Sequence, residues 1–145
     1  GINYVYKKAK SYEMLNSNYQ ETVKLTCIEK TIVDCIYRID LAGCLDEIYK
    51  ALSLIKYLDE QKLLNALLLY NKAILYKKVG YILKQFPNLN ISTKFFSIVH
   101  SFICLNSEYL VDYSRDNQHL DKEWSLIVPN KIDAHDPTED IYGIY

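Results

Sequence analysis

Residues 26–36 read Thr-Cys-Ile-Glu-Lys-Thr-Ile-Val-Asp-Cys-Ile, and this stretch organises the fold predicted for the whole chain. Its apolar residues recur with helical spacing and would form one stripe, made of Ile28, Ile32, Cys35 and Ile36. Thr26 stands three residues before Glu29, the spacing of a capping box, which predicts Thr26 as the N-cap and Glu29 as its reciprocal partner. We therefore expect the first helix here, with the other elements arranged around it.

The opposite face of this helix carries charges of alternating sign. Lys30, Asp34 and Arg38 are spaced four residues apart, so that neighbouring side chains attract one another. Such a ladder is usually a solvated face. The alternative is a polar cluster, with either a partner-binding role or, the reading we favour, a structural role that holds the connection 40–43. The residues predicted for the structural cluster are Thr26, Glu29, Asp34, Arg38 and Asp40.

Composition indicates one globular domain and excludes several kinds of protein. The chain has 145 residues, a net charge of −1, and a hydrophobic half that includes 14 tyrosines. No apolar run approaches the ~20 residues that a membrane-spanning helix needs. The four cysteines, at positions 27, 35, 44 and 104, form no Cys-x-x-Cys pair. We therefore expect no structural metal, no cofactor, no membrane contact, and free thiols in a reducing cytoplasm.

Strands are predicted at both ends of the chain and helices in the middle. Aromatic and β-branched residues favour an antiparallel meander over residues 1–27, with strands near 2–6, 11–15 and 21–25. Near the other end, 108–111 and 123–128 are predicted as strands, and the polar residues 114–122 between them as a loop. The expected fold is α+β, with a small, mostly antiparallel sheet that unites the strands of both ends and packs against about five helices.

Apolar periodicity and capping residues place the four later helices. The second has its apolar stripe over 45–55; Asp59 caps a third helix over 60–69, which is apolar around much of its circumference and is expected to be central. A fourth covers 72–86 and stops before Pro87, and Ser92 caps the fifth. Residues 1–130 are taken as the domain, and 131–145 as an acidic C-terminal tail.

Glycine content argues against several catalytic motifs. The chain has four glycines, no two of them close together, so it lacks the phosphate-binding loops and the nucleophile elbow, which need glycine for tight backbone approach. We expect no catalytic residues and no enzymatic activity. Gly80 lies inside the fourth helix, where it costs about 1 kcal/mol relative to alanine. We expect another part of the backbone to pack closely there.

One face of the fourth helix combines basic and aromatic side chains. Helical spacing sets this face opposite the core stripe 75–86, and lysines interleaved with aromatic rings can hold phosphate and stack on bases. The commoner role of such a face is to keep a helix soluble. The residues predicted for binding nucleic acid or an acidic protein partner are Tyr70, Lys77, Lys78, Tyr81 and Lys84.

Three blocks of the sequence resemble the AbiEi-type antitoxins and their relatives among transcriptional regulators. The first is Thr-x-x-Glu-Lys-Thr-Ile-Val-Asp-Cys-Ile at 26–36, followed by Arg38 and Asp-Leu-Ala-Gly at 40–43. The later two are Val-Gly-Tyr-Ile-Leu at 79–83 and Trp-Ser-Leu-Ile-Val-Pro at 124–129. The chain departs from the family where Lys30 replaces a common Arg and Cys44 a common second Gly.

The resemblance implies the antitoxin half of a type IV toxin–antitoxin system, which acts in abortive infection as a defence against phage. Such antitoxins usually carry an N-terminal winged helix that binds promoter DNA and a C-terminal domain needed to oppose a nucleotidyltransferase-like toxin without an obligatory stable complex. This chain resembles that C-terminal domain. The resemblance also implies a winged helix upstream. The chain opens without Met, as a fragment of a longer protein would. The alternative is a regulatory or dimerisation domain of a DNA-binding regulator with no antitoxin role.

Overall fold

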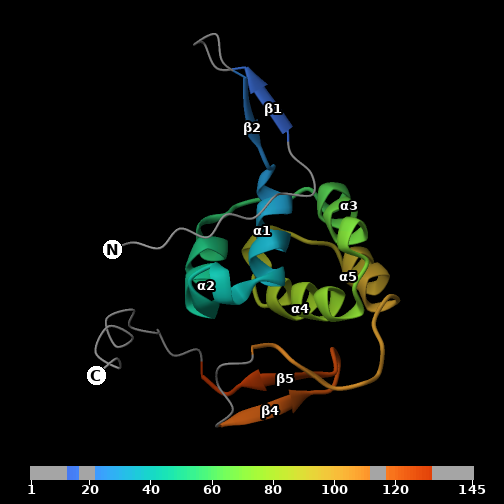
Figure 1. Ribbon diagram of the computed structural model, residues 1–145. Coiled ribbons are helices and arrows are strands. Elements are labelled where there is room, and N and C mark those ends of the chain that lie inside the picture. Colours follow the sequence, from blue (N-terminus) through green and yellow to red (C-terminus); the bar gives the residue numbers. More distant parts are fainter. Residues whose placement is uncertain (1–12, 17–21, 112–116, 132–145) are drawn as a thin grey trace, which may run out of the picture.

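The chain folds as an α+β domain in which a layer of helices separates two small sheets (Figure 1). The computed structural model describes residues 13–16, 22–111 and 117–131. The helices of these residues are α1 (Ile28–Tyr37), α2 (Cys44–Leu54), α3 (Glu60–Tyr70), α4 (Ala73–Lys84) and α5 (Thr93–His100), with 3₁₀ turns η1 (Ile39–Leu41) and η2 (Pro87–Leu89). The predicted fold class is confirmed.

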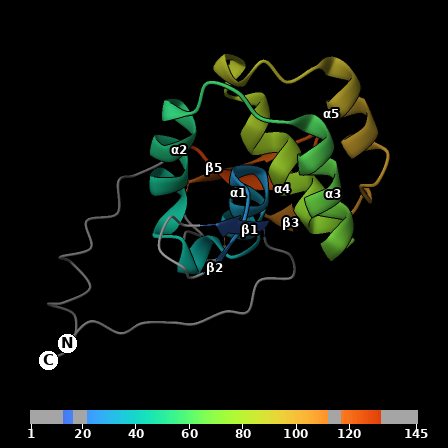
Figure 2. The ribbon, with the colours of Figure 1, turned by 90° about the horizontal axis from the view of Figure 1, so that it is seen from above.

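Helix α1 lies at the centre of the helical layer, as its sequence predicts. It packs against α2, α3 and α4 (Figure 2). Ile32, Val33 and Ile36 are buried in this contact. The predicted stripe therefore lies in the core at Ile32 and Ile36, but it is wrong at Ile28, which is 47% exposed at the start of the helix.

The predicted capping box at the start of α1 is wrong. Cys27 is the N-cap and makes no side-chain cap, while the Thr26 hydroxyl lies 2.6 Å from the hydroxyl of Thr31. The Glu29 carboxylate instead accepts a hydrogen bond from the backbone N–H of Asp59, at 2.9 Å. Because that N–H lies at the N-cap of α3, Glu29 joins two helices and does not close its own first turn.

The caps of α3 and α5 are confirmed. Asp59 Oδ1 accepts from the backbone N–H groups of Gln61 and Lys62, at 2.9 and 3.1 Å. The hydroxyl of Ser92 accepts from the N–H of Phe95, at 3.2 Å. Helix α3 is less central than predicted, because its large apolar residues at positions 68 and 69 are exposed.

The N-terminal strands form a separate hairpin. Strand β1 (Glu13–Asn16) pairs antiparallel with β2 (Thr22–Leu25), and the hairpin projects from one end of the helical layer (Figure 1). The strand predicted near 2–6 lies outside the described residues.

The second sheet lies on the other side of the helices and has the order β3-β5-β4. Strand β3 (Glu108–Tyr109) runs parallel to β5 (Leu126–Pro129), and β4 (Gln118–Asp121) runs antiparallel to it. The prediction of one sheet that unites both chain ends is wrong, because the helices stand between the two sets of described strands. The loop predicted over 114–122 is wrong at β4, a polar edge strand held by backbone pairing with β5. Residues 132–145, almost all of the predicted tail, lie outside the described residues.

Helix α4 packs on both of its faces. Its core stripe of Leu75, Val79, Ile82 and Leu83 is buried among the helices, as predicted. Its other face meets the segment of β3 and β5 (Figure 1). There Gly80 packs directly under the ring of Trp124, where a Cβ would overlap the indole. The close approach expected at Gly80 is therefore real, but a side chain makes it and not a second backbone.

Candidate functional site

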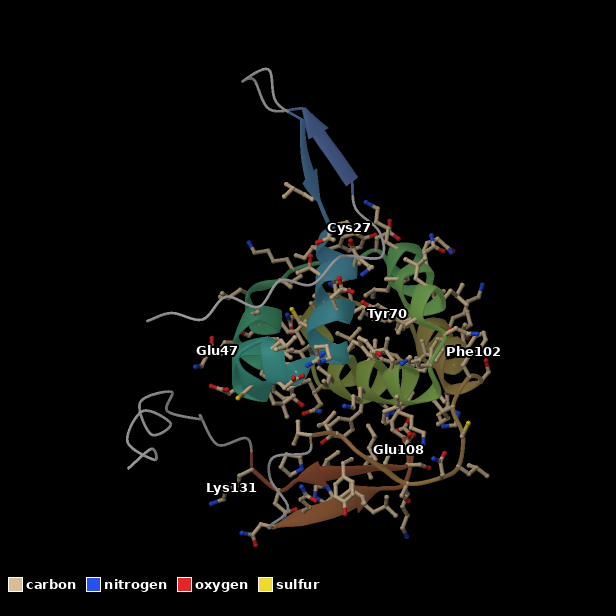
Figure 3. The ribbon with its side chains drawn as sticks, in the orientation of Figure 1. Cys27, Glu47, Tyr70, Phe102, Glu108 and Lys131 are labelled. Carbon is tan, nitrogen blue, oxygen red and sulfur yellow. The ribbon has the colours of Figure 1, made fainter. Side chains whose placement is uncertain are left out.

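The basic face predicted on α4 is covered in part by the C-terminal sheet, which buries Lys77. Lys77 has 0% of its surface exposed. Its ammonium donates to the carbonyl of Asn106 and, at 2.8 Å, to Oε2 of Glu108, the residue labelled between α4 and the sheet in Figure 3. Lys84 pairs with the Glu123 carboxylate, with 2.7 Å between Nζ and Oε2. The prediction of an exposed lysine face is wrong at Lys77, which the sheet buries, whereas the Lys84 side chain is 49% exposed. Helical spacing identified one buried stripe, but α4 is covered on a second face as well.

The two predicted tyrosines also lie away from a common exposed face. Tyr81 is half-buried, and burial followed by the charge of Asp121 raises its pKa. Tyr70 belongs to α3, and its hydroxyl donates to Asp34 on α1 at 2.6 Å (Figure 3). Burial first, and then this carboxylate, raise the pKa of Tyr70 well above its ordinary value.

The predicted polar cluster divides into three separate sites. Thr26 and Glu29 act at the start of α1, as described above. Asp34 receives the Tyr70 hydroxyl and the ammonium of Lys30, which is only 3% exposed, so the predicted solvated ladder is wrong at this position. Arg38 and Asp40 form a third site beyond the end of α1.

Arg38 and Asp40 make a two-pronged ion pair on the surface. The Arg38 Nε donates to Asp40 Oδ1 at 2.8 Å, and Nη2 donates to Oδ2 at 2.6 Å. The hydrogen bond from Arg38 lowers the pKa of Asp40, and the same bond raises the pKa of Arg38. Both groups therefore stay charged, and the fork geometry sets the direction of the guanidinium.

The backbone after this pair makes an unusual turn into α2. Gly43 has φ +80° and Cys44 has φ +73°, two successive residues in the left-handed region. Glycine enters this region without steric cost, whereas a side chain with a Cβ is strained there. The turn thus carries backbone strain at Cys44 and fixes η1, with Asp40 in it, against α2.

A groove of about 530 Å³ opens between η1 and α4. It is lined from three parts of the chain by Tyr37, Arg38, Ile39, Asp40, Lys78, Leu110 and Val111. Its volume falls within the range of small-molecule sites. The groove brings together Lys78, from the predicted binding set, with Arg38 and Asp40, from the predicted polar cluster.

Tyr37 connects the groove to a second group of polar and aromatic side chains. Its ring contacts that of Tyr70 with 4.5 Å between centroids, and its hydroxyl accepts from the Lys72 ammonium at 2.8 Å. Lys30 and Asp34 lie behind this pair. A further positive charge therefore stands close to the edge of the groove.

The arrangement suits an anionic ligand. Among the described lining residues, Arg38 and Lys78 carry positive charge and Asp40 carries a carboxylate, while the nearly buried Ile39, Leu110 and Val111 form an apolar wall. Sequence reasoning missed the wall and Tyr37. An aromatic residue beside Arg38 was a signal available for Tyr37, but nothing local in the sequence places residues 110 and 111 beside η1.

Within the described part of the chain, no group of three or more His, Cys, Asp or Glu side chains is arranged to hold a metal ion. None of the described helices is long and apolar enough to cross a membrane. Comparisons with models of protein families, with curated proteins and with solved structures each found no match.

Proposed function

We propose that this chain is the antitoxin domain of an AbiEi-type, type IV toxin–antitoxin system. In this role it counteracts a nucleotidyltransferase-like toxin in the cytoplasm during abortive infection. It does so by binding and not by catalysis, and a winged helix upstream supplies the DNA binding of the full-length protein. The groove beside Arg38 and Lys78 is its binding surface.

The turn at Gly43 and Cys44 is the observation that carries the proposal. The family that the sequence resembles commonly has two glycines at these positions, and both residues have positive φ here. That is the conformation for which glycine is selected. The backbone thus has the shape that a Gly-Gly pair would serve, although the second residue of this chain is cysteine.

The packing of the three similar blocks supports the same proposal. The first block forms α1 and η1, and the second lies in α4, which packs on α1. Trp124 of the third block packs on Gly80 of the second. Blocks far apart in sequence therefore form one packing unit, and the groove opens at its edge.

A growth assay tests the proposal. The full-length protein is expressed together with the nucleotidyltransferase-like protein encoded beside it, and we expect growth to be restored. A deletion of this domain that leaves the winged helix intact should lose the rescue but keep binding to promoter DNA. The alternative, a regulatory or dimerisation domain without an antitoxin role, predicts the opposite results. In that case the intact protein never restores growth, and deletion of the domain impairs control of the promoter.

A further inference from the structure

We propose that the groove between η1 and α4 binds a ribonucleotide unit, with its phosphate at Arg38 and Lys78 and its ribose at Asp40. This inference rests on the proposed function in one respect: it assigns a ligand to the groove that was proposed there as the binding surface. The ligand is either a free nucleotide or the phosphorylated end of an RNA strand, because both present the same chemistry.

The phosphate site follows from the donors that Arg38 retains. A guanidinium has five N–H donors, and Asp40 occupies two of them, through Nε and Nη2. The remaining three are directed by the fork that Asp40 holds. Lys78, from a different element, lines the same groove and adds a second positive charge. Guanidinium and ammonium groups together are a common arrangement for a phosphate.

The carboxylate of Asp40 favours a ribonucleotide over an acidic peptide. A peptide carboxylate would be repelled by Asp40, whereas a sugar hydroxyl can donate to it. In nucleotide-binding folds a carboxylate commonly holds the ribose hydroxyls in this way. A suitable ligand therefore carries an anionic group, which faces the positive side chains of the groove, and hydroxyl donors a few bonds away, which face Asp40.

The remaining lining residues offer the base little surface. Ile39 and Val111 keep only 5% and 4% of their surface exposed and Leu110 keeps none, so they close the floor of the groove. The ring of Tyr37 is already packed against Tyr70, so it offers an edge to the groove and not a stacking platform. We therefore place the base at the mouth of the groove, which implies weak discrimination among bases.

Binding is measured by isothermal titration with the full chain, using AMP, 2′-deoxy-AMP, and a 5′-phosphorylated RNA hexamer and its DNA counterpart as probes. We expect the ribose forms to bind about tenfold more tightly, as the loss of one hydrogen bond to a charged group would give. Binding of AMP identifies a mononucleotide site, and binding of the hexamer alone identifies a strand end. Failure of all probes to bind at millimolar concentration overturns the proposal, as does equally tight binding of hexaglutamate, which would indicate an acidic protein partner.

Three variants separate the groove from general charge effects. Lys78→Met should weaken binding of AMP about tenfold, while Lys56→Met, which removes an exposed lysine outside the groove, should leave it unchanged. Asp40→Ala should abolish the preference for ribose, and it should also weaken binding of both nucleotides because Asp40 directs the Arg38 guanidinium. A retained preference for ribose in Asp40→Ala, or equal affinities of the two lysine variants, would contradict the assignment. Growth rescue without nucleotide binding refutes this inference alone, whereas nucleotide binding without rescue refutes the antitoxin role alone.

Discussion

At the scale of single residues, Glu29 has a larger structural role than its neighbour Thr26. Its carboxylate is buried and accepts the N–H of Asp59 across 30 positions of sequence, while Thr26 bonds only to Thr31. Glu29→Ala should therefore lower the free energy of unfolding by about 1.5–3 kcal/mol, as loss of a hydrogen bond to a buried charge does. Thr26→Ala should cost less than about 0.5 kcal/mol, the range of surface changes. Urea denaturation followed by circular dichroism measures both free energies. A larger loss of stability in Thr26→Ala than in Glu29→Ala would support the capping box and contradict the role given to Glu29.

Cys44 offers a second test at the residue scale. A non-glycine residue in the left-handed region pays roughly 1–2 kcal/mol, and a glycine there pays about 0.5–1 kcal/mol more chain entropy on folding. Cys44→Gly should thus be more stable than Cys44→Ala, which also removes the thiol but keeps the Cβ. Thermal melts of the two variants compare them directly. A more stable alanine variant would show that the turn has a different backbone conformation.

At the scale of elements, the ion pair of Lys77 and Glu108 attaches α4 to β3. Lys77→Ala leaves Glu108 without its partner inside this contact. It should lower the free energy of unfolding by about 3 kcal/mol. This value is at the lower end of the range for a broken buried ion pair, because Glu108 is partly exposed. Lys77→Met keeps most of the buried volume and should cost clearly less. Chemical denaturation tests the order. Two variants as stable as the unaltered chain would place Lys77 at the surface.

The same elements show what the sequence could and could not predict. Helix positions follow from apolar period and from the side-chain caps Asp59 and Ser92, because these signals act within one turn of chain. The Thr26 cap failed because the carboxylate of Glu29 finds a tertiary partner. The prediction of an exposed face on α4 is wrong at Lys77 because a carboxylate 31 positions later in the sequence pairs with it under the sheet. Lys84 also pairs with a distant carboxylate, 39 positions later, but it stays half exposed. Sequence alone predicts that a charged residue on a helix is exposed to solvent, because a partner far away in the sequence cannot be identified.

At the scale of the whole molecule, function is assigned to a groove that no single segment predicts. Arg38 and Asp40 come from the end of the first helix, Lys78 from α4, and Leu110 and Val111 from the segment after β3. The individual charged residues were visible in the sequence, but only the packing of α1 on α4 brings them together. The groove therefore stands apart from Lys77, the lysine of α4 that the sheet buries.

The most direct test is growth rescue by the full-length protein carrying Lys78→Met, beside Lys56→Met as the matched control. Both variants lose one positive charge, but only the first removes it from the groove. We predict that Lys78→Met, shown by its circular dichroism spectrum to fold normally, rescues growth from the nucleotidyltransferase-like toxin much less well, and that Lys56→Met rescues fully. Full rescue by Lys78→Met would contradict the assignment of function to the groove.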